Sequence, residues 1–507
     1  MESLIDVHMP NPTRGIKYLI LLLLLKSSVL SATTYPAEGA SFFARRIPFV
    51  AEKMKGADRY RFKIYEGRME ESRKIKESPL FEEERTTNEL ITELPSFNVE
   101  YSWWVEYLDK SGEKIGKSKI VHFRVLGPDE QHYRIRVLEN KYADSTLCFF
   151  LDGCDALYNL KGEVVWYMAD KRDPGKQLSK IDIRLSPFNT VTYIAGGQGY
   201  EVDYNGNVLW STPPGDTANR KVLNYHHELR RLSSGNYMTL INEVQDRWIP
   251  KDMVDGKDSL YKDVVFDAIV EYSDEGKTVW EWHSAPFFSN EEIFSKRTKH
   301  GDFNPRTNLN AFCFDEKSEI LYVSFRHISK IFKISYPAKA VLSRYTGKRK
   351  NGFLKQHSVN INLDGDFYFF SNGNGSPASI SIAESAIDDD LQDTVASIVV
   401  LSEVAGDTNN YTKKWEFPCM IDSEASPTSA RAGSVQQLAD GSYFVCMGAT
   451  PRIFIVNKNK EILYNAIVEQ WNNADQKWLP FLQYRASPVT INELDKLING
   501  SIPAGKR

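Results

Sequence analysis

The stretch FLKQHSVNINLDGDFYFFSNGN (353–374) decides the fold, because it reads as one strand, a glycine turn and a second strand. The pattern is a polar residue or histidine, an apolar run, a turn and another apolar run. It returns in YHHELRRLSSGNYMTLINE (225–243), TNLNAFCFDEKSEILYVSFRH (307–327) and SVQQLADGSYFVCMGATPRIFIVNKNKEILYN (434–465). Internal repetition at this spacing predicts a repeat architecture rather than a single sheet.

A second repeated phrase alternates with the first, and it ends in tryptophan. It appears as ALYNLKGEVVWY (156–167), GYEVDYNGNVLWS (199–211) and DAIVEYSDEGKTVWEW (267–282). Two hairpins that recur together every 40 to 60 residues are typical of a propeller blade. The count gives five or six blades, and we expect a six-bladed β-propeller over residues 129–490. The acidic segment at 381–393 is expected to be a loop insertion, and residues 491–507 a C-terminal tail.

Residues 33–128 differ from the repeats and are expected to form a small β-sandwich domain. RYRFKIYEG (59–67) and the segment VEYSWWVEYLDKSGEKIGKSKIVHFRV (99–125) alternate strongly between apolar and polar residues. LPSF followed by a Tyr-x-Trp strand resembles a fibronectin type III module. Its residues offer no catalytic constellation, so this domain is interpreted as a scaffold or docking unit. The fold class is therefore all-β.

Residues 1–32 read as a signal peptide. The apolar run YLILLLLL (18–25) is far shorter than the about 20 residues needed to cross a bilayer, and small residues follow it. An uncleaved anchor is the alternative. We expect an exported protein, periplasmic or at the cell surface, with no integral span after cleavage. In an oxidising compartment five cysteines can pair, and the candidate pairs are Cys148 with Cys154 and Cys419 with Cys446. The alternative is that all five are small buried hydrophobic residues.

Composition narrows the class of partner. The chain has 507 residues, is 42% hydrophobic and carries a formal net charge of −4. Such a chain can build large cores, and the absence of a basic excess argues against a nucleic-acid partner. No metal-ligand spacing and no cofactor motif stands out, and the sequence does not fix the oligomeric state.

Three side chains occupy equivalent places in the repeats. His357 and His227 each stand eight residues before their turn glycines, and Arg326 ends a strand in ILYVSFRH (320–327). Because propeller strands that begin near the axis direct their first residues into the central channel, we expect these three to line one pocket. A guanidinium and two imidazoles suit an oxyanion and a nucleophilic step. Each histidine alone could instead be structural, and His226 competes with His227 for the pocket-facing position.

Four segments together resemble the bacterial arylsulfate sulfotransferases. They are HHELRRLSSGNYM (226–238), NLNAFCFDEKSEILYVSFRHISKIFKI (308–334), KQHSVNINLDGDFYFFSNGN (355–374) and GSVQQLADGSYFVCMGATPRIFIV (433–456). The resemblance covers about residues 150–490. It implies a six-bladed propeller with a central active site and no adenosine-based sulfate donor or other cofactor. The implied reaction moves a sulfuryl group from an aryl sulfate donor to a phenolic acceptor through a sulfated histidine.

The resemblance also implies roles for individual residues. The nucleophilic histidine falls on His357, and the arginine and the second histidine fall on Arg326 and His227. The family carries a further histidine where this chain has Asn308. This departure removes a titratable group but keeps a hydrogen-bond donor.

Several alternatives accompany these assignments. His300 or His327 could replace the histidine that is absent at position 308, and Phe353 or Trp248 could stack on the aryl rings. Two further functions compete with catalysis. One is a catalytically inactive propeller that binds sulfated or phenolic ligands, and the other is a structural interaction protein.

Overall fold

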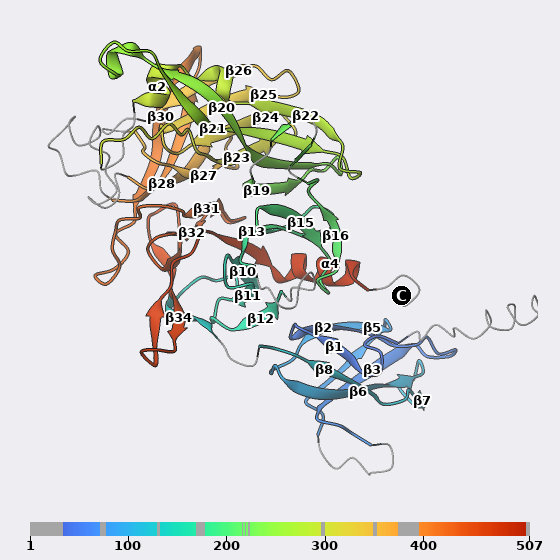
Figure 1. Ribbon diagram of the computed structural model, residues 1–507. Helices are drawn as coiled ribbons and strands as arrows, with labels where there is room; N and C mark the ends of the chain where they lie inside the picture. Colours follow the sequence, from blue (N-terminus) through green and yellow to red (C-terminus); the bar gives the residue numbers. More distant parts are fainter. Residues whose placement is uncertain are drawn as a thin grey trace, which may run out of the picture.

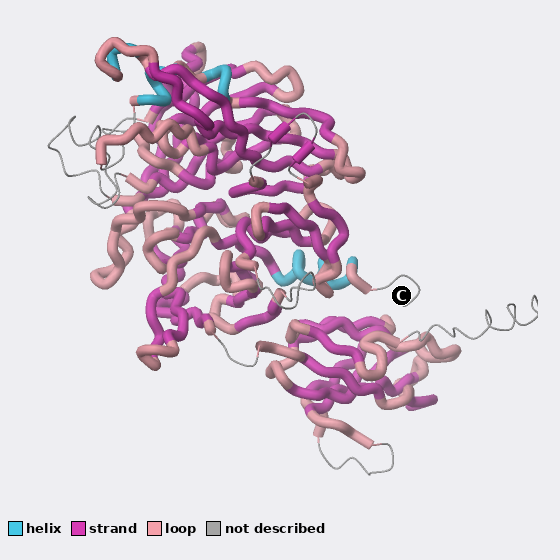
Figure 2. The backbone as a smooth tube through the Cα atoms, in the orientation of Figure 1, coloured by secondary structure: helices cyan, strands magenta, loops and turns pink. Residues whose placement is uncertain are grey.

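The computed structural model describes residues 34–70, 78–128, 132–168, 178–214, 216–217, 220–221, 224–295, 300–347, 352–373 and 395–502. Strands dominate this part of the chain, with a few short helices (Figure 2). The expected signal peptide and the acidic insertion at 381–393 lie outside the described residues. The expectation of an all-β protein is confirmed.

The N-terminal unit consists of two sheets that enclose one core. Its strands are β1 (Ala40–Phe42), β2 (Arg46–Val50), β3 (Arg59–Glu66), β4 (Phe81–Arg85), β5 (Glu89–Glu93), β6 (Val99–Leu108), β7 (Lys114–Lys117) and β8 (Val121–Val125). One sheet has the order β1-β8-β6-β3-β4 with β7 on β6, and the other pairs β2 with β5. Phe49 of β2 and Trp103 of β6 meet edge to face between the sheets, with ring centroids 5.2 Å apart. The Tyr101 hydroxyl donates to the Ser96 carbonyl at 3.0 Å, a tyrosine corner typical of immunoglobulin-like sandwiches. The fibronectin type III likeness stays a prediction.

The remaining chain forms six blades of four antiparallel strands each, within the described residues. A few elements lie outside the blades: β17 (Asp216–Thr217), β18 (Arg220–Lys221), 3-10 turns at Lys251–Met253 and Ala285–Phe287, and helices α2 (Asn290–Phe294) and α4 (Ile491–Gly500). From the innermost strand outward, the first blade is β36 (Ala486–Thr490), β10 (Leu147–Leu151), β11 (Ala156–Asn159) and β12 (Val164–Tyr167), and the second is β13 (Lys180–Leu185), β14 (Val191–Ala195), β15 (Gln198–Val202) and β16 (Val208–Ser211). The third blade is β19 (Tyr225–Arg231), β20 (Tyr237–Ile249), β21 (Ser259–Tyr272) and β22 (Thr278–His283), and the fourth is β23 (Leu309–Asp315), β24 (Ile320–Phe325), β25 (Lys330–Ser335) and β26 (Val341–Thr346). The fifth blade is β27 (His357–Ile361), β28 (Phe367–Ser371), β29 (Ser397–Val404) and β30 (Asp407–Pro418), and the sixth is β31 (Ser434–Gln437), β32 (Tyr443–Cys446), β33 (Arg452–Val456) and β34 (Ile462–Asn472). The six four-stranded sheets match in number and strand order the six blades predicted from the repeats.

Both ends of the propeller chain contribute to closing the ring. The C-terminal strand β36 is the innermost strand of the first blade and pairs with β10. At the other end, β9 (Tyr133–Asn140) pairs with β34 on the outside of the last blade, where β35 (Lys477–Pro480) also pairs. The tail expected at 491–507 is wrong in its first part, because residues 491–500 form helix α4. The apolar residues Leu494, Leu497 and Ile498 recur at helical spacing, and all three are buried against the first two blades.

Polar side chains link each innermost strand to the next around the whole ring. Every link joins a residue of one blade to a backbone group or side chain of its neighbour, so the circle is complete. The links are Asp182 to the Leu229 amide (3.0 Å), Glu228 to the Phe312 amide (3.0 Å), Asn310 to the Gln356 carbonyl (2.8 Å), Ser358 to the Val435 amide (3.3 Å), Ser434 to the Ala486 carbonyl (3.1 Å) and Arg485 to Asp182 (2.9 Å). Because buried polar groups are costly without partners, this ring specifies how the blades stack about the axis.

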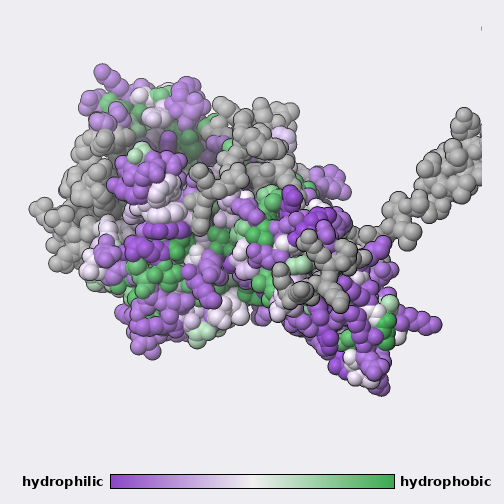
Figure 3. Space-filling model, turned by 90° about the horizontal axis from the view of Figure 1, so that it is seen from below, coloured by the Kyte–Doolittle hydropathy of each residue, from purple (hydrophilic) through white to green (hydrophobic). Residues whose placement is uncertain are grey.

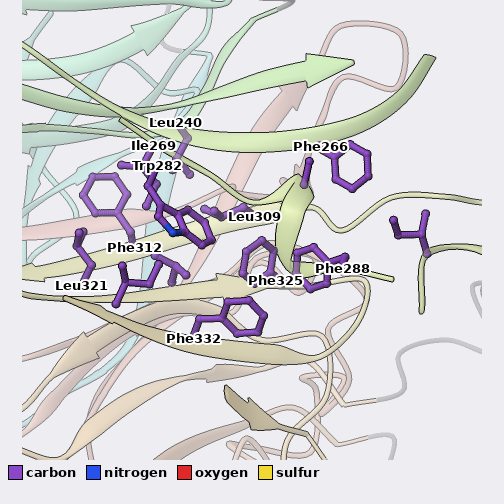
Figure 4. Close-up of a cluster of buried hydrophobic side chains, with 14 of the residues drawn as sticks. Leu240, Phe266, Ile269, Trp282, Phe288, Leu309, Phe312, Leu321, Phe325 and Phe332 are labelled. Atoms are coloured by element: carbon purple, nitrogen blue, oxygen red, sulfur yellow. The ribbon is translucent and has the colours of Figure 1, made fainter. Parts of the chain in front are cut away.

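Apolar residues fill the space between neighbouring blades. In the third and fourth blades, Trp282, Leu309 and Phe325 lie in one buried cluster with side chains from both sheets (Figure 4). Because side chains alternate along each strand, every other residue packs between one pair of neighbouring blades and the residues in between pack on the opposite face of the sheet. The aromatic-rich composition is thus explained by sheet-on-sheet packing.

The N-terminal unit docks on the outer edge of the first blade and on α4 (Figure 1). Ala44 makes an isolated antiparallel bridge to Trp166 of β12, the outermost strand of that blade. The Arg45 amide donates to the Val165 carbonyl at 2.8 Å. Arg46 makes a bidentate pair with Asp495 of α4 at 2.5 and 2.8 Å. The sandwich is therefore held by backbone and charge contacts at the rim of the propeller.

The five cysteines are free thiols, so the expected pairings are wrong. Cys148 packs in the core between the first and second blades, whereas Cys154 packs on the other side of the first blade. Cys419 and Cys446 are divided between two cores in the same way. Because the two side chains of each pair enter different layers, no bridge can form without moving the sheet.

One face of the molecule is seen from below in Figure 3. Hydrophilic residues cover most of the described surface there, and hydrophobic residues gather near the middle. Among the described helices, none has the length and apolar character needed to cross a membrane.

Candidate active site

One cavity brings together all four residues singled out from the sequence. His227, Asn308, Arg326 and His357 line a space of about 450 Å³ at the ends of strands from three blades. His227 lies near the start of β19 and His357 starts β27, while Asn308 directly precedes β23 and Arg326 directly follows β24. The lining also contains Arg431, Ala432, Leu482, Gln483 and Tyr484. Convergence of equivalent repeat positions, which the sequence predicted, is thus observed.

Local backbone distortions direct these side chains into the cavity. His227 has a φ of 59°, Asn308 a φ of 55°, and Ser358, next to His357, a φ of 57°. The pairing register shifts beside each of them, as expected for a β-bulge. A bulge changes which face of the strand a side chain takes, and non-glycine residues with such φ values gather at functional sites. Asparagine and histidine tolerate this conformation better than most residues.

The ring of His357 is held in one tautomer. Its Nδ1 lies 2.5 Å from Oδ1 of Asn372 and 3.1 Å from the Lys355 carbonyl oxygen. The amide nitrogen of Asn372 donates to the carbonyls of Ser429 and Ala432, both at 2.9 Å, so its oxygen must face the histidine. Two acceptors around Nδ1 require a proton there, and Nε2 therefore keeps its lone pair.

The electrostatic surroundings keep His357 neutral. Burial, with a further contribution from the Arg326 guanidinium, lowers the pKa of His357 to about 3. An imidazole is a nucleophile only in its neutral form. The ring is thus neutral and nucleophilic throughout the physiological pH range.

His227, not His226, faces the cavity. The His227 ring lies 5.7 Å from the Tyr484 ring, centroid to centroid. His226 lies behind it, with Nε2 at 3.0 Å from the Asn242 amide nitrogen. Burial, followed by the proximity of His226, lowers the pKa of His227 well below its usual value. Both imidazoles that line the cavity are therefore neutral.

Arg326 and Asn308 are tied to each other through the backbone. The Arg326 amide donates to the Asn308 carbonyl at 2.9 Å, and Nη2 of Arg326 donates to the Ala430 carbonyl at 3.0 Å. Arg431 adds a second guanidinium to the lining, and no described carboxylate lines the cavity. The cavity is thus suited to an anion.

A third arginine lies beside the cavity in the blade ring. Arg485 is buried, and its guanidinium donates to Asp182 at 2.9 Å, to Glu228 at 2.6 Å and to the Asn310 carbonyl at 2.7 Å. Both carboxylates also pair with other arginines, Asp182 with Arg184 and Glu228 with Arg230, so Arg485 is part of a buried ionic network that serves the frame of the site. It also contributes to the lowered pKa of both His227 and His357.

Some residues were missed or misplaced by sequence reasoning. Asn372 was missed, although it follows β28 directly, where β28 pairs with the start of β27. The guess that Phe353 or Trp248 stacks on a ligand is wrong. Phe353 packs in the core between the fourth and fifth blades, and Trp248 is 56% exposed at the far end of β20. Tyr484 is instead the aromatic residue of the described lining.

The proposed substitutes for the absent histidine do not reach the cavity. Neither His300 nor His327 contributes to the described lining, and His300 is exposed. Asn308 itself occupies the position. The arrangement therefore combines one nucleophilic imidazole with a guanidinium, an amide and a second imidazole as hydrogen-bond donors.

Comparisons with solved structures return proteins of low similarity. A protein of unknown function from Bacteroides caccae is 11% identical with a TM-score of 0.39, over 71% of this chain and 99% of that chain. A streptogramin B lyase is 8% identical with a TM-score of 0.37, over 71% and 100%. An auxiliary nutrient binding protein from Bacteroides thetaiotaomicron is 9% identical with a TM-score of 0.35, over 90% and 89%.

Comparison by sequence gives a clearer result. No functionally curated protein matches the chain. The model of the arylsulfotransferase (ASST) family matches residues 152–488, which is well over half of the chain and includes every residue that lines the cavity. The chain therefore belongs to the arylsulfotransferase family.

Proposed function

We propose that this protein transfers a sulfuryl group from an aryl sulfate to a phenol through a sulfohistidine formed on His357. One observation carries the proposal. The two acceptors at Nδ1 of His357 leave the Nε2 lone pair available in a cavity that also contains Arg326 and no described carboxylate. A neutral nucleophile beside a fixed cation is what attack on an anionic sulfate ester requires.

In the first step, Nε2 of His357 attacks sulfur. The N–S bond forms while the S–O bond to the aryl group breaks, and the aryl oxygen leaves as a phenolate that takes a proton from water. The imidazole becomes positively charged as the N–S bond forms. Its Nδ1–H bond to Asn372 therefore strengthens during the step, and Asn372 stabilises the transition state more than the ground state.

In the second step, a phenolic acceptor takes the group. The acceptor gives its proton to the hydroxide that the first step left in the solvent, its oxygen attacks sulfur, and the N–S bond breaks to return neutral His357. One imidazole thus serves both half reactions. No adenosine-based donor or other cofactor enters the balance.

The donors around the cavity match the charge that develops. Sulfuryl transfer, like phosphoryl transfer, is expected to pass through a loose state with charge spread over peripheral oxygens. We assign Arg326, His227 and Asn308 to these oxygens, and one such donor supplies about 3–4 kcal/mol in comparable sites. Tyr484 and Leu482 provide an aromatic and an apolar surface for the aryl ring.

The test is a transfer assay with a chromogenic aryl sulfate, with and without a phenol acceptor. The wild-type chain should release the coloured phenol in an acceptor-dependent manner, and His357→Ala should abolish release. His283→Ala is the matched control, because His283 lies on the outer strand of the third blade and pairs with Glu243. Binding of the aryl sulfate without turnover between pH 5 and 9 would instead indicate a ligand-binding propeller. The export expected from residues 1–32 is part of the proposal, and cell fractionation tests it.

A further inference from the structure

A second imidazole stands directly behind His227. Nδ1 of His226 lies 2.5 Å from Nδ1 of His227, and the two rings meet at an interplanar angle of 87°. Two ring nitrogens cannot approach so closely unless one hydrogen lies between them. One histidine must therefore donate through Nδ1 and the other must accept there.

Asn242 decides the direction of this hydrogen bond. Its side-chain nitrogen donates to Oδ1 of Asp267 at 2.9 Å and lies 3.0 Å from Nε2 of His226. The carboxylate can only accept, so Asn242 turns its nitrogen toward His226, and Nε2 of His226 must accept as well. The direct distance from Nε2 of His226 to Oδ1 of Asp267 is 3.4 Å, which is too long for a good hydrogen bond.

The remaining protons follow from this assignment. Since Nε2 of His226 accepts, its proton is on Nδ1 and is donated to Nδ1 of His227. His227 must then carry its own proton on Nε2, on the side of the ring away from His226. Asp267 is itself fixed, because its other oxygen accepts from the Leu309 amide at 2.9 Å and the Thr307 hydroxyl at 3.1 Å.

We propose that His226 and Asn242 are positioning residues that hold His227 as its Nε2–H tautomer, so that His227 is only a hydrogen-bond donor toward the sulfate ester. The inference rests on the sulfuryl transfer proposed above. The two cavity imidazoles then have opposite tautomers and separate roles. His357 keeps the lone pair that attacks sulfur, and His227 has no exposed lone pair with which to compete for the sulfuryl group.

The charges around the pair favour a neutral His227. The titratable and charged groups beside it and His226 are Asp267 on β21, Arg326 after β24, His357 on β27, and Tyr484 and Arg485 before β36. Only one of these five is a carboxylate, and it lies beside His226 rather than His227. A neutral imidazole with a fixed proton can donate to an oxyanion without giving up that proton.

The experiment measures the tautomers directly. Long-range proton–nitrogen spectra of the full chain, labelled with 15N-histidine, distinguish a protonated ring nitrogen from an unprotonated one. His227→Asn and His357→Asn assign the two signals. We expect His227 to have a protonated Nε2 and a bare Nδ1, and His357 to show the reverse. His226→Phe should move the His227 signals toward a mixture of both tautomers, whereas His283→Phe, on the same blade, should leave them unchanged.

Activity gives a second readout in the same variants. His226→Phe should lower kcat with an aryl sulfate by about tenfold, with KM nearly unchanged, because one transition-state donor is partly lost. If His226→Phe does not fold, Asn242→Ala should produce the same spectral change, since it removes the donor to Nε2 of His226. A wild-type His227 with a bare Nε2, or variants with wild-type His227 signals, would overturn the inference. Because the spectra need no substrate, they decide it independently of turnover, whereas an inactive wild type would overturn only the proposed transfer.

Discussion

Replacing Asn372 by alanine tests whether this side chain positions the ring of His357 or only stabilises the folded protein. The side chain accepts from Nδ1 of His357 at 2.5 Å and donates to the carbonyls of Ser429 and Ala432 at 2.9 Å each. Alanine removes all three bonds, while the Lys355 carbonyl at 3.1 Å still faces Nδ1. The ring of His357 thus keeps one of its two acceptors.

The expected losses in stability and in reaction rate both follow from the number and type of these hydrogen bonds. Three buried hydrogen bonds at about 1 kcal/mol each predict a loss of about 3 kcal/mol in the free energy of unfolding. The bond to His357 becomes a bond to a charged ring as the N–S bond forms, and such bonds contribute about 1.5–3 kcal/mol. Formation of the sulfohistidine should therefore slow by about 10- to 100-fold, since 1.4 kcal/mol is a factor of ten.

The assay is a single turnover with enzyme in excess over a chromogenic aryl sulfate, combined with denaturant unfolding. Asn360→Ala is the control, because Asn360 lies on β27, the strand that begins with His357, and donates to the Ser358 and Val435 carbonyls without touching His357. It should lose stability without slowing the chemical step. Equal slowing in both variants, or an unchanged rate in Asn372→Ala, would refute the positioning argument.

Three further predictions test other parts of the site. The rate of the first half reaction should not change between pH 8 and 5, because the lowered pKa of His357 keeps the ring neutral there, and a rate that follows an ordinary histidine titration would contradict this. The contribution of His357 to the free energy of unfolding, measured as the difference between the wild type and His357→Ala, should fall by about 1.4 kcal/mol per pH unit as the pH drops from 6.5 toward 3, because the unfolded chain binds the proton first. Asn308→His should speed transfer from aryl sulfates with poor leaving groups in a steady-state assay, and slower transfer would mean that the site is adapted to asparagine. Arg485→Met should lower the free energy of unfolding by about 3 kcal/mol, since it removes the hydrogen bonds from Arg485 to Asp182 and Glu228 at about 1.5 kcal/mol each, while Arg184 still pairs with Asp182 and Arg230 with Glu228, and a denaturant midpoint equal to that of the wild type would count against the blade-ring role.

The repeat architecture could be read from the sequence because each hairpin carries its own turn glycine and apolar alternation. Gly235 and Gly365 have positive φ values of 90° and 85°, which the turn requires and which glycine accepts at little cost. The ends of the propeller chain gave no such signal. The helix at 491–500 is short, and β36 closes the first blade only through a partner more than 300 residues away.

The site could be located but not fully assigned. His227 and His357 were found because equivalent repeat positions converge at the axis. Asn372 and Asn242 were missed because each supports a histidine through one side-chain hydrogen bond, and an isolated asparagine after or within a strand has no distinctive pattern. The count of residues to the turn glycine favoured His227 over His226, and the bulge at His227 gives the structural reason why this ring faces the cavity.

The most direct test of the central claim is the mass of the chain after reaction with an aryl sulfate alone. We expect one sulfuryl group to be added to the peptide that contains His357, His357→Ala to abolish the addition, and a phenol to remove the group again. Addition of the group to another peptide, or release of the phenol with no added mass at any time, would contradict it.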